Sequence, residues 1–330
     1  MDDRSRTDNV EFNDVQLKFI EIMRHDLRTV EERNNFLLWI ADFNVNSCKS
    51  GQTDIRKPEI DSRLDEIVKD IRKRVPEFST FPSEKIVVPT TGDNSDCQPE
   101  TTVHVDGFLY KDADIDVLAE EGELQRDYCL DCGSRNVAPL TFISHSMSRE
   151  KLDFVFNVML PPNFVKKIVG SENSLCPCLL DVGSRHGGTL YSAYLHSDIE
   201  KIVGVEMNKD FCSLQREICK KHRMQDRVTI VEDDISNQKE KVKEAKLIFL
   251  NNPFEFFLSI DEQKQIWLFL KENITAGTTL ICVPDLETTF DKLEMKSELH
   301  SWVKKLEPHN SLAACGADED FADLHMYRVL

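Results

Sequence analysis

The sequence predicts an α/β protein in which a doubly wound, mostly parallel sheet follows an N-terminal helical region. Three observations lead to this fold class. Short apolar runs alternate with helical segments from residue 179 onward, which is the pattern of a parallel sheet. Each of the first four runs closes on an acidic, amide or glycine residue. A glycine-rich turn follows the first run, as in sheets that bind a ligand at the carboxyl ends of their strands.

The hydrophobic period places the strands and helices of the C-terminal half. Apolar runs bounded by turn residues predict strands at 179–182, 201–205, 228–231, 247–250 and 278–283. Apolar residues at helical spacing predict helices at 189–196, 260–273 and 286–306. The last apolar run, 324–330, is expected to form a final strand that is antiparallel and lies at the edge of the sheet.

The N-terminal half has a different texture. Helical spacing predicts helices over 14–44, 59–75 and 149–159. Proline, glycine and polar residues mark a linker after the second of these helices. We therefore divide the chain into a helical region, a linker, a cysteine-containing segment and an α/β domain, with bounds at 1–76, 77–103, 104–160 and 161–330.

The charge and cysteine content exclude several classes of protein. The chain of 330 residues carries a formal net charge of −18, which argues against coating nucleic acid or anionic membrane through bulk charge. It has no run of 18 apolar residues and no apolar segment near Met1, so we expect neither a membrane span nor a signal peptide. Ten cysteines are too few for a disulfide scaffold. We expect a protein of the cytoplasm or nucleus.

The acidic residues are densest over 104–131. Together with the N-terminal helices, this block is a candidate surface for a protein partner with a basic segment. The alternative is a solvated acidic loop that binds nothing.

The polar residues at the ends of the predicted strands suggest a nucleoside cofactor. Glycines at a strand-to-helix turn let the backbone approach a ligand closely. Glu206 comes 25 residues after Asp181, and an acid about 20 positions past such a turn can accept hydrogen bonds from ribose hydroxyls. A tight structural loop is the alternative for the turn alone. The candidate residues are Asp181, Gly183, Ser184, Gly187, Glu206, Asp233 and Asp234.

With these residues, the segment 176–330 resembles the class I S-adenosylmethionine (SAM) methyltransferase superfamily. The resemblance implies a seven-strand sheet, with the glycine turn at the methionine part of SAM. It also implies that Glu206 binds the ribose and that Asp233 or Asp234 meets the adenine amino group. We prefer Asp234, because an apolar residue follows it, as in the family. Arg185 stands where the family usually has glycine, so its side chain must point away from the cofactor or narrow the pocket.

The motif after the fourth strand faces the methyl acceptor in this superfamily. It consists of Asn251, Asn252, Pro253 and Phe254. The motif is similar both to the Asn-Pro-Pro-Phe/Tyr motif of amino-methylating enzymes and to the Asn-Asn-Phe-Ala-Phe stretch of non-SET histone-lysine methyltransferases. Both resemblances imply direct transfer to an amino nitrogen that Asn251 orients, while Phe254 and Phe256 exclude water. We prefer a protein lysine over a nucleic-acid base. For the rings, core packing is an equal alternative.

The middle segment contains a candidate zinc knuckle. Cys129 and Cys132 form a Cys-x2-Cys pair followed by glycine, a turn that can point two thiolates at one ion. His104 and His145 are the preferred further ligands, while Cys97, Cys176 and Cys178 are substitutes. Two buried thiols in a turn are the alternative.

Two functions follow from these patterns. The first is an active SAM-dependent methyltransferase that acts on a protein or RNA acceptor. The alternative is a catalytically inactive protein of the same fold that serves as a protein-binding or scaffold module, and Arg185 is the residue that favours it.

Overall fold

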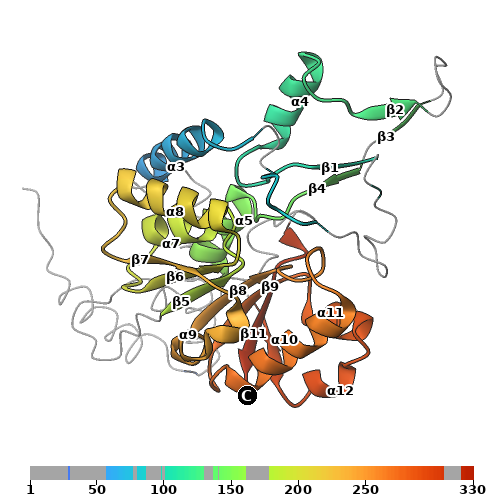
Figure 1. Ribbon diagram of the computed structural model, residues 1–330. Helices are drawn as coiled ribbons and strands as arrows, with labels where there is room; N and C mark the ends of the chain where they lie inside the picture. The colour runs from blue at the N-terminus through green and yellow to red at the C-terminus, as the bar shows by residue number, and fades with distance from the viewer. Residues whose placement is uncertain are drawn as a thin grey trace, which may run out of the picture. The chain divides into compact units, whose positions relative to one another are not determined.

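The structure is a computed structural model that describes Thr29, Gln98 and the ranges 57–76, 80–86, 101–129, 137–139, 141–160, 178–307 and 321–330 (Figure 1). Within it, residues 58–330 form one compact unit. Of the helix predicted over 14–44, only Thr29 is among the described residues. The start of the predicted α/β domain at residue 161 lies outside them. No helix in the described part of the chain is both long enough and apolar enough to cross a membrane.

A seven-strand sheet forms the centre of this unit, in the order β10-β11-β9-β8-β5-β6-β7. Its strands are β5 (Leu179–Val182), β6 (Ile202–Glu206), β7 (Val228–Glu232), β8 (Leu247–Asn251), β9 (Thr279–Val283), β10 (Val303–Leu306) and β11 (His325–Val329). The strands β5 to β9 pair in parallel, whereas β11 runs antiparallel to both of its neighbours. The predicted mostly parallel α/β sheet of seven strands is therefore confirmed.

Two details of the predicted topology are wrong. The final strand β11 is antiparallel as expected, but it lies inside the sheet between β9 and β10. The helix predicted over 286–306 is divided into α11 (Leu286–Lys292), α12 (Lys296–Leu299) and the edge strand β10. The break between α11 and α12 contains Glu294, whose left-handed φ of +56° cannot continue a right-handed helix.

Helices cover both faces of the sheet (Figure 1). One face carries α7 (Gly188–His196) and α8 (Lys209–Lys221), and the other carries α9 (Lys239–Glu244), α10 (Ile260–Asn273) and α11. Successive strand residues alternate between the two cores: Leu179 packs in the first and Leu180 in the second. This alternation is the consequence of the two-residue period of a strand, and it explains why the strands read as continuous apolar runs.

The N-terminal part of the unit packs on the first of these cores. The helix α3 (Lys57–Arg72) buries Ile67 and Ile71 completely. The helix α5 (Arg149–Phe154) continues as a π-helical turn, η3 (Val155–Met159), against the same core.

Five further short elements precede α5 in the chain. Strand β1 (Thr102–His104) pairs in parallel with β4 (Thr141–Ile143), and β2 (Asp127–Cys129) pairs antiparallel with β3 (Val137–Pro139). The helix α4 (Asp112–Glu120) lies between β1 and β2 in the chain. Because parallel strands end at the same edge of a sheet, the carboxyl ends of β5, β6 and β8 meet, and the loops around β1 and β4 contact that edge.

Candidate cofactor site

A cavity of about 610 Å³ lies at the carboxyl ends of β5, β6 and β8. Its volume is in the range of pockets that hold small molecules and cofactors. The structure brings nine of the predicted site residues to its wall: Gly183, Glu206, Asp233, Asp234, Asn251, Asn252, Pro253, Phe254 and His145. Asp181, Ser184 and Gly187 do not line it.

Glu206 at the end of β6 is held by two backbone donors. Its Oε1 accepts the N–H of Asn208 at 2.8 Å, and its Oε2 accepts the N–H of Arg185 at 2.9 Å. Burial raises the pKa of Glu206, although both backbone hydrogen bonds oppose this rise. Each carboxylate oxygen has a second lone pair, so Glu206 can still accept hydrogen bonds from a ligand.

The Arg185 side chain is bound to two buried carboxylates. Its guanidinium donates to both oxygens of Glu84, at 2.8 and 3.0 Å, and to Oδ2 of Asp106 at 2.6 Å. Both arginine and glutamate side chains are less than a tenth exposed. Burial alone would lower the pKa of Arg185, but the hydrogen bonds with Glu84 and the charge of Asp106 outweigh it, and the pKa is raised. Arg185 therefore carries a permanent charge that its partners hold in place.

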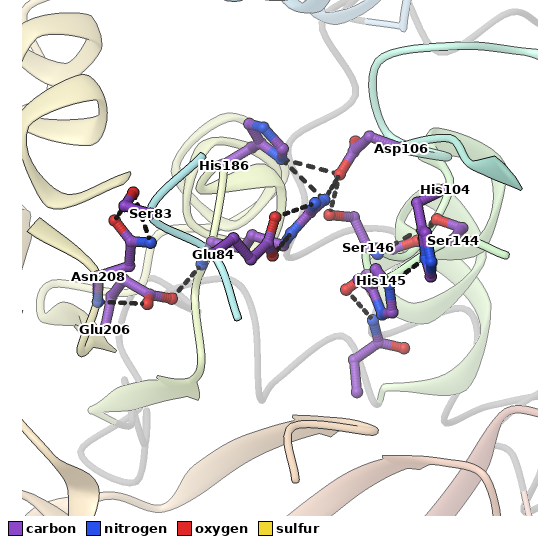
Figure 2. Close-up of polar contacts among 12 residues, drawn as sticks. Ser83, Glu84, His104, Asp106, Ser144, His145, Ser146, His186, Glu206 and Asn208 are labelled. Atoms are coloured by element: carbon purple, nitrogen blue, oxygen red, sulfur yellow. Dashed lines mark hydrogen bonds and ion pairs between the residues drawn. The ribbon is translucent and has the colours of Figure 1, made fainter. Parts of the chain in front are cut away.

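Asp106 is the centre of this buried network (Figure 2). Its Oδ2 also accepts from His186 Nδ1 at 2.8 Å and from the Ser146 hydroxyl at 2.5 Å. Burial would raise the pKa of Asp106, but the nearby His186 and Arg185 hold it well below its usual range. The residue anchors the loop after β1 to the turn after β5.

The glycine turn is shaped by its own packing. Gly187 has a φ of +85°, and a Cβ there would lie 2.6 Å from the ring of Tyr191. The Ser184 hydroxyl donates to Gln215 at 2.9 Å inside the protein. Asp181 is buried, which raises its pKa to about 7 despite a hydrogen bond with Thr189. These three predicted residues therefore build the turn, whereas Gly183 lines the cavity itself.

The two acids after β7 are used differently. Asp233 accepts hydrogen bonds from Asn237 and Gln238, at 2.9 and 2.6 Å, as well as from the next backbone N–H. Asp234 caps the short 3-10 helix η4 (Ile235–Asn237) with Oδ1 alone. Among the described residues its Oδ2 has no partner, so Asp234 is the freer of the two acceptors.

At the end of β8, Asn251 faces a loop that follows β4. Its side-chain amide donates to the carbonyl of His145 at 3.2 Å, which leaves the amide oxygen for other donors. Asn252 has a left-handed φ of +42° and donates through its side chain to Glu255 at 2.7 Å. His145 and Phe257 complete this end of the cavity.

The two rings expected to exclude water are packed in the protein. Phe254 is 5 % exposed, belongs to the second core and contacts Trp267 edge to face, yet one part of it reaches the cavity. Phe256 is 2 % exposed and packs on the ring of His145. Phe257, one position further along the chain, also lines the cavity. Phe256 is therefore a core residue, as the alternative expected, and Phe254 is mainly one.

The structure separates the predicted zinc ligands. His104 Nδ1 and His145 Nε2 lie 2.9 Å apart in a direct hydrogen bond at the β1–β4 pair, so neither nitrogen is free for a metal in this arrangement. Burial, together with the charge of Arg185, lowers the pKa of His145 to about 3, which keeps the ring neutral. Cys129 belongs to the separate β2–β3 pair, and Cys132 lies outside the described residues.

Of the three substitute zinc ligands, only Cys178 lies in the described part of the chain. Cys178 stands before β5, at the opposite end of that strand from the cavity, and burial raises its pKa to about 11. Cys97 and Cys176 lie outside the described residues. Nowhere in the described ranges do three or more His, Cys, Asp or Glu side chains gather as a metal site would require.

The sequence analysis did not predict several residues of the site. Ser83, Glu84 and Lys85, from the segment expected to be a linker, line the cavity. Asp106 belongs to the acidic block 104–131, for which the sequence suggests a partner surface or a solvated loop. No local pattern could have marked Glu84 or Asp106, because their partner Arg185 follows them by 101 and 79 positions.

No protein-family model matches the chain, and neither does any curated protein. Solved structures do match it. An RNA methyltransferase from Salinibacter ruber in complex with S-adenosyl-L-homocysteine is 17 % identical; the match covers 46 % of this chain and 78 % of that one, with a TM-score of 0.32. A SAM-dependent O-methyltransferase from Thermotoga maritima is 18 % identical, with coverage of 49 % and 54 % and a TM-score of 0.35. A putative caffeoyl-CoA O-methyltransferase from Staphylococcus aureus is 14 % identical, with coverage of 65 % and 91 % and a TM-score of 0.35.

Proposed function

We propose that the protein is a SAM-dependent methyltransferase that transfers a methyl group to an amino nitrogen. One observation carries the proposal. A carboxylate held by two backbone N–H groups, Glu206, shares one cavity with the Asn251 motif at the end of β8. These are the two positions that the family resemblance assigns to the ribose and to the methyl acceptor.

The charges of the cavity support a cationic cofactor. Five carboxylates and three cationic side chains line it: Glu84, Glu206, Asp210, Asp233 and Asp234, with Lys85, Arg185 and Lys209. Because Arg185 is neutralised by its own carboxylate partners, the wall left for a ligand is negative. SAM, when bound, supplies an electrophilic methyl group and carries a positive charge on the sulfonium, which such a wall stabilises.

The residues of this chain would act by binding and orientation. Glu206 would accept hydrogen bonds from the ribose hydroxyls, and Asp234, through its free Oδ2, would accept from the adenine amino group. Asn251 would accept an N–H of the acceptor through its amide oxygen, because its NH2 group already donates to His145. Holding two reactants in line can supply much of the rate enhancement of such a transfer.

The acceptor end of the cavity is walled by His145 and Phe257. A neutral imidazole and a phenyl ring exclude water from an amine that must react without its extra proton. We prefer a protein lysine over a nucleic-acid base on the sequence resemblance alone.

Calorimetry with SAM and with S-adenosylhomocysteine tests the cofactor. We expect binding by the wild-type protein and at least tenfold weaker binding by Glu206→Ala, which corresponds to about 1.4 kcal/mol. Asp70→Asn, which removes a buried carboxylate on α3 away from the cavity, is the matched control and should bind normally. No heat and no thermal shift at millimolar ligand would overturn the proposal.

Transfer itself is tested with labelled SAM against fractionated cell extract. Asn251→Ala should keep cofactor binding and lose transfer, since its amide oxygen is proposed to touch only the acceptor. Label in an RNA fraction would replace the lysine preference.

The alternative, an inactive protein of this fold that binds a partner, was favoured by Arg185. Arg185 lines the cavity, but its guanidinium is paired with Glu84 and Asp106, and this pairing supports the active enzyme over the alternative. Cofactor binding without transfer to any extract fraction would restore the alternative.

A further inference from the structure

We infer that the segment 80–86, hereafter the strap, belongs to the cofactor site. It positions the Glu206 carboxylate without itself contacting the ribose. The inference builds on the proposed function, because it concerns the same cofactor. Both backbone N–H groups that hold the Glu206 carboxylate belong to residues whose side chains are tied to the strap (Figure 2).

The first tie runs through Arg185. Its N–H holds Oε2 of Glu206, and its guanidinium forms a two-pronged ion pair with Glu84 of the strap. The φ of Arg185 is +43°, a left-handed conformation that costs a side-chain-bearing residue energy unless its surroundings impose it. The ion pair with Glu84 supplies such a constraint, and it fixes the direction of the N–H that Glu206 accepts.

The second tie runs through Asn208. Its N–H holds Oε1 of Glu206, and its side-chain amide donates to the Ser83 hydroxyl of the strap at 3.1 Å. Ser83 in turn donates to Asp210 in the first turn of α8 at 2.5 Å. Asn208 also caps α8, since its Oδ1 accepts the N–H of Asp210 at 2.9 Å. The strap therefore fixes the turn that carries the second donor.

An aromatic contact holds the strap between these ties. Phe81 packs edge to face on Phe211 with ring centroids 5.0 Å apart, and the guanidinium carbon of Arg185 lies 5.2 Å from the same Phe211 ring. Ser83, Glu84 and Lys85 line the cavity beside Glu206. The strap thus forms a wall of the cavity and supports the carboxylate that would bind the ribose. Ser83 and Glu84 are positioning residues in this arrangement.

A double-mutant cycle measured by calorimetry with S-adenosylhomocysteine tests this role. In the wild-type background, Ser83→Ala combined with Glu84→Gln should weaken binding at least tenfold. In the Glu206→Gln background, where no carboxylate remains to be positioned, the same pair should change affinity less than twofold. A merely structural strap would lower affinity equally in both backgrounds, and that result overturns the inference.

Asp70→Asn is the matched control for Glu84→Gln. Asp70 is also a buried acid of the N-terminal part that pairs with the sheet domain, through Lys221 and His222, but it does not line the cavity. It should lower the melting temperature without changing affinity. Equal loss of affinity in this control would show that general destabilisation is the cause and would overturn the inference.

The outcomes for the inference and for the proposed function are distinct. If the folded wild-type protein binds no S-adenosylhomocysteine, the proposed function fails. If it binds and the strap variants bind equally well, only the inference fails. Should Glu84→Gln prevent folding, Ser83→Ala alone leaves the buried ion pair intact. It should weaken binding about threefold in the wild-type background and not in the Glu206→Gln background, and an unchanged affinity refutes the role of the strap.

Discussion

Asp181 should make the stability of the protein fall as the pH rises towards neutrality. Its carboxyl is buried at the end of β5, and burial, with a smaller effect of the nearby Glu206 charge, raises its pKa from 3.8 to about 7. Between these two pH values the folded state keeps the proton and the unfolded state has lost it. The unfolding free energy therefore decreases with pH in this interval and levels off above the folded pKa. Asp181→Asn removes the titration with little change in side-chain volume.

The size of the effect follows from the two pKa values. Each unit of pH within the interval changes the unfolding free energy by about 1.4 kcal/mol. From about pH 5.5 to about pH 8, the linkage relation gives a loss of about 2 kcal/mol for wild type relative to Asp181→Asn. Lower pH values approach the isoelectric point of about 5.0, where solubility is poorest, so this window is the useful one.

Urea unfolding at a series of pH values measures the difference directly. Asp114→Asn is the control. Burial would raise the pKa of Asp114, but the hydrogen bonds from the Lys111 backbone N–H and the Arg72 guanidinium outweigh burial, so this pKa is lowered. A lowered carboxyl pKa gives stability that is lost only as the pH falls below the usual range, so this variant and wild type should run parallel in the window. Parallel curves for wild type and Asp181→Asn would refute the reasoning about Asp181.

Two further predictions concern the packing around the cavity. Gly187→Ala should lower the unfolding free energy by at least about 2 kcal/mol, because it places a Cβ on a residue with a left-handed φ and that Cβ would overlap the Tyr191 ring. Gly183 also has a left-handed φ, but the nearest contact of its added Cβ is 3.4 Å, so Gly183→Ala should cost only about 1 kcal/mol. Equal losses in urea unfolding would contradict the packing argument. Phe254→Ala should lower the unfolding free energy by about 3 kcal/mol, because the ring packs in the core against Trp267. A normal melting temperature together with lost cofactor binding would instead show that the ring contacts the ligand.

The parts of the fold that depend on local pattern were predictable. The strands β5 to β9 and the helix α10 begin and end within a residue or two of their predicted bounds, because buried strands and amphipathic helices are recorded in hydrophobic period. The edge strand β10 was missed for the same reason. Only two of its four side chains are buried or partly buried, those of Val303 and Leu306. Nothing in the local sequence shows that this segment pairs with β11.

The site residues also differ in whether the local sequence pattern could predict them. Glu206, Asp234 and Asn251 could be placed at one edge from the sequence, because each ends or follows a parallel strand and such ends meet. Glu84 and Asp106 could not, because their contacts with Arg185 close loops of 101 and 79 residues. The sequence does show Arg185 as an unusual residue in a glycine turn. It does not show that two buried carboxylates compensate it.

Arg185 also shows which segments the proposed cofactor site depends on. Both carboxylates that neutralise the buried Arg185 guanidinium come from segments that precede the C-terminal sheet, Glu84 and Asp106, and removing one partner of a buried ion pair while the other stays buried is strongly destabilising. Truncation to the C-terminal sheet would also expose the first core, since α3 and α5 contribute Ile67, Ile71 and Leu152 to it. The strap, the loop after β1 and the sheet therefore belong to one folded unit. A substitution that separates Glu84 from Arg185 should disturb the proposed cofactor site even though it lies in a segment with the composition of a linker.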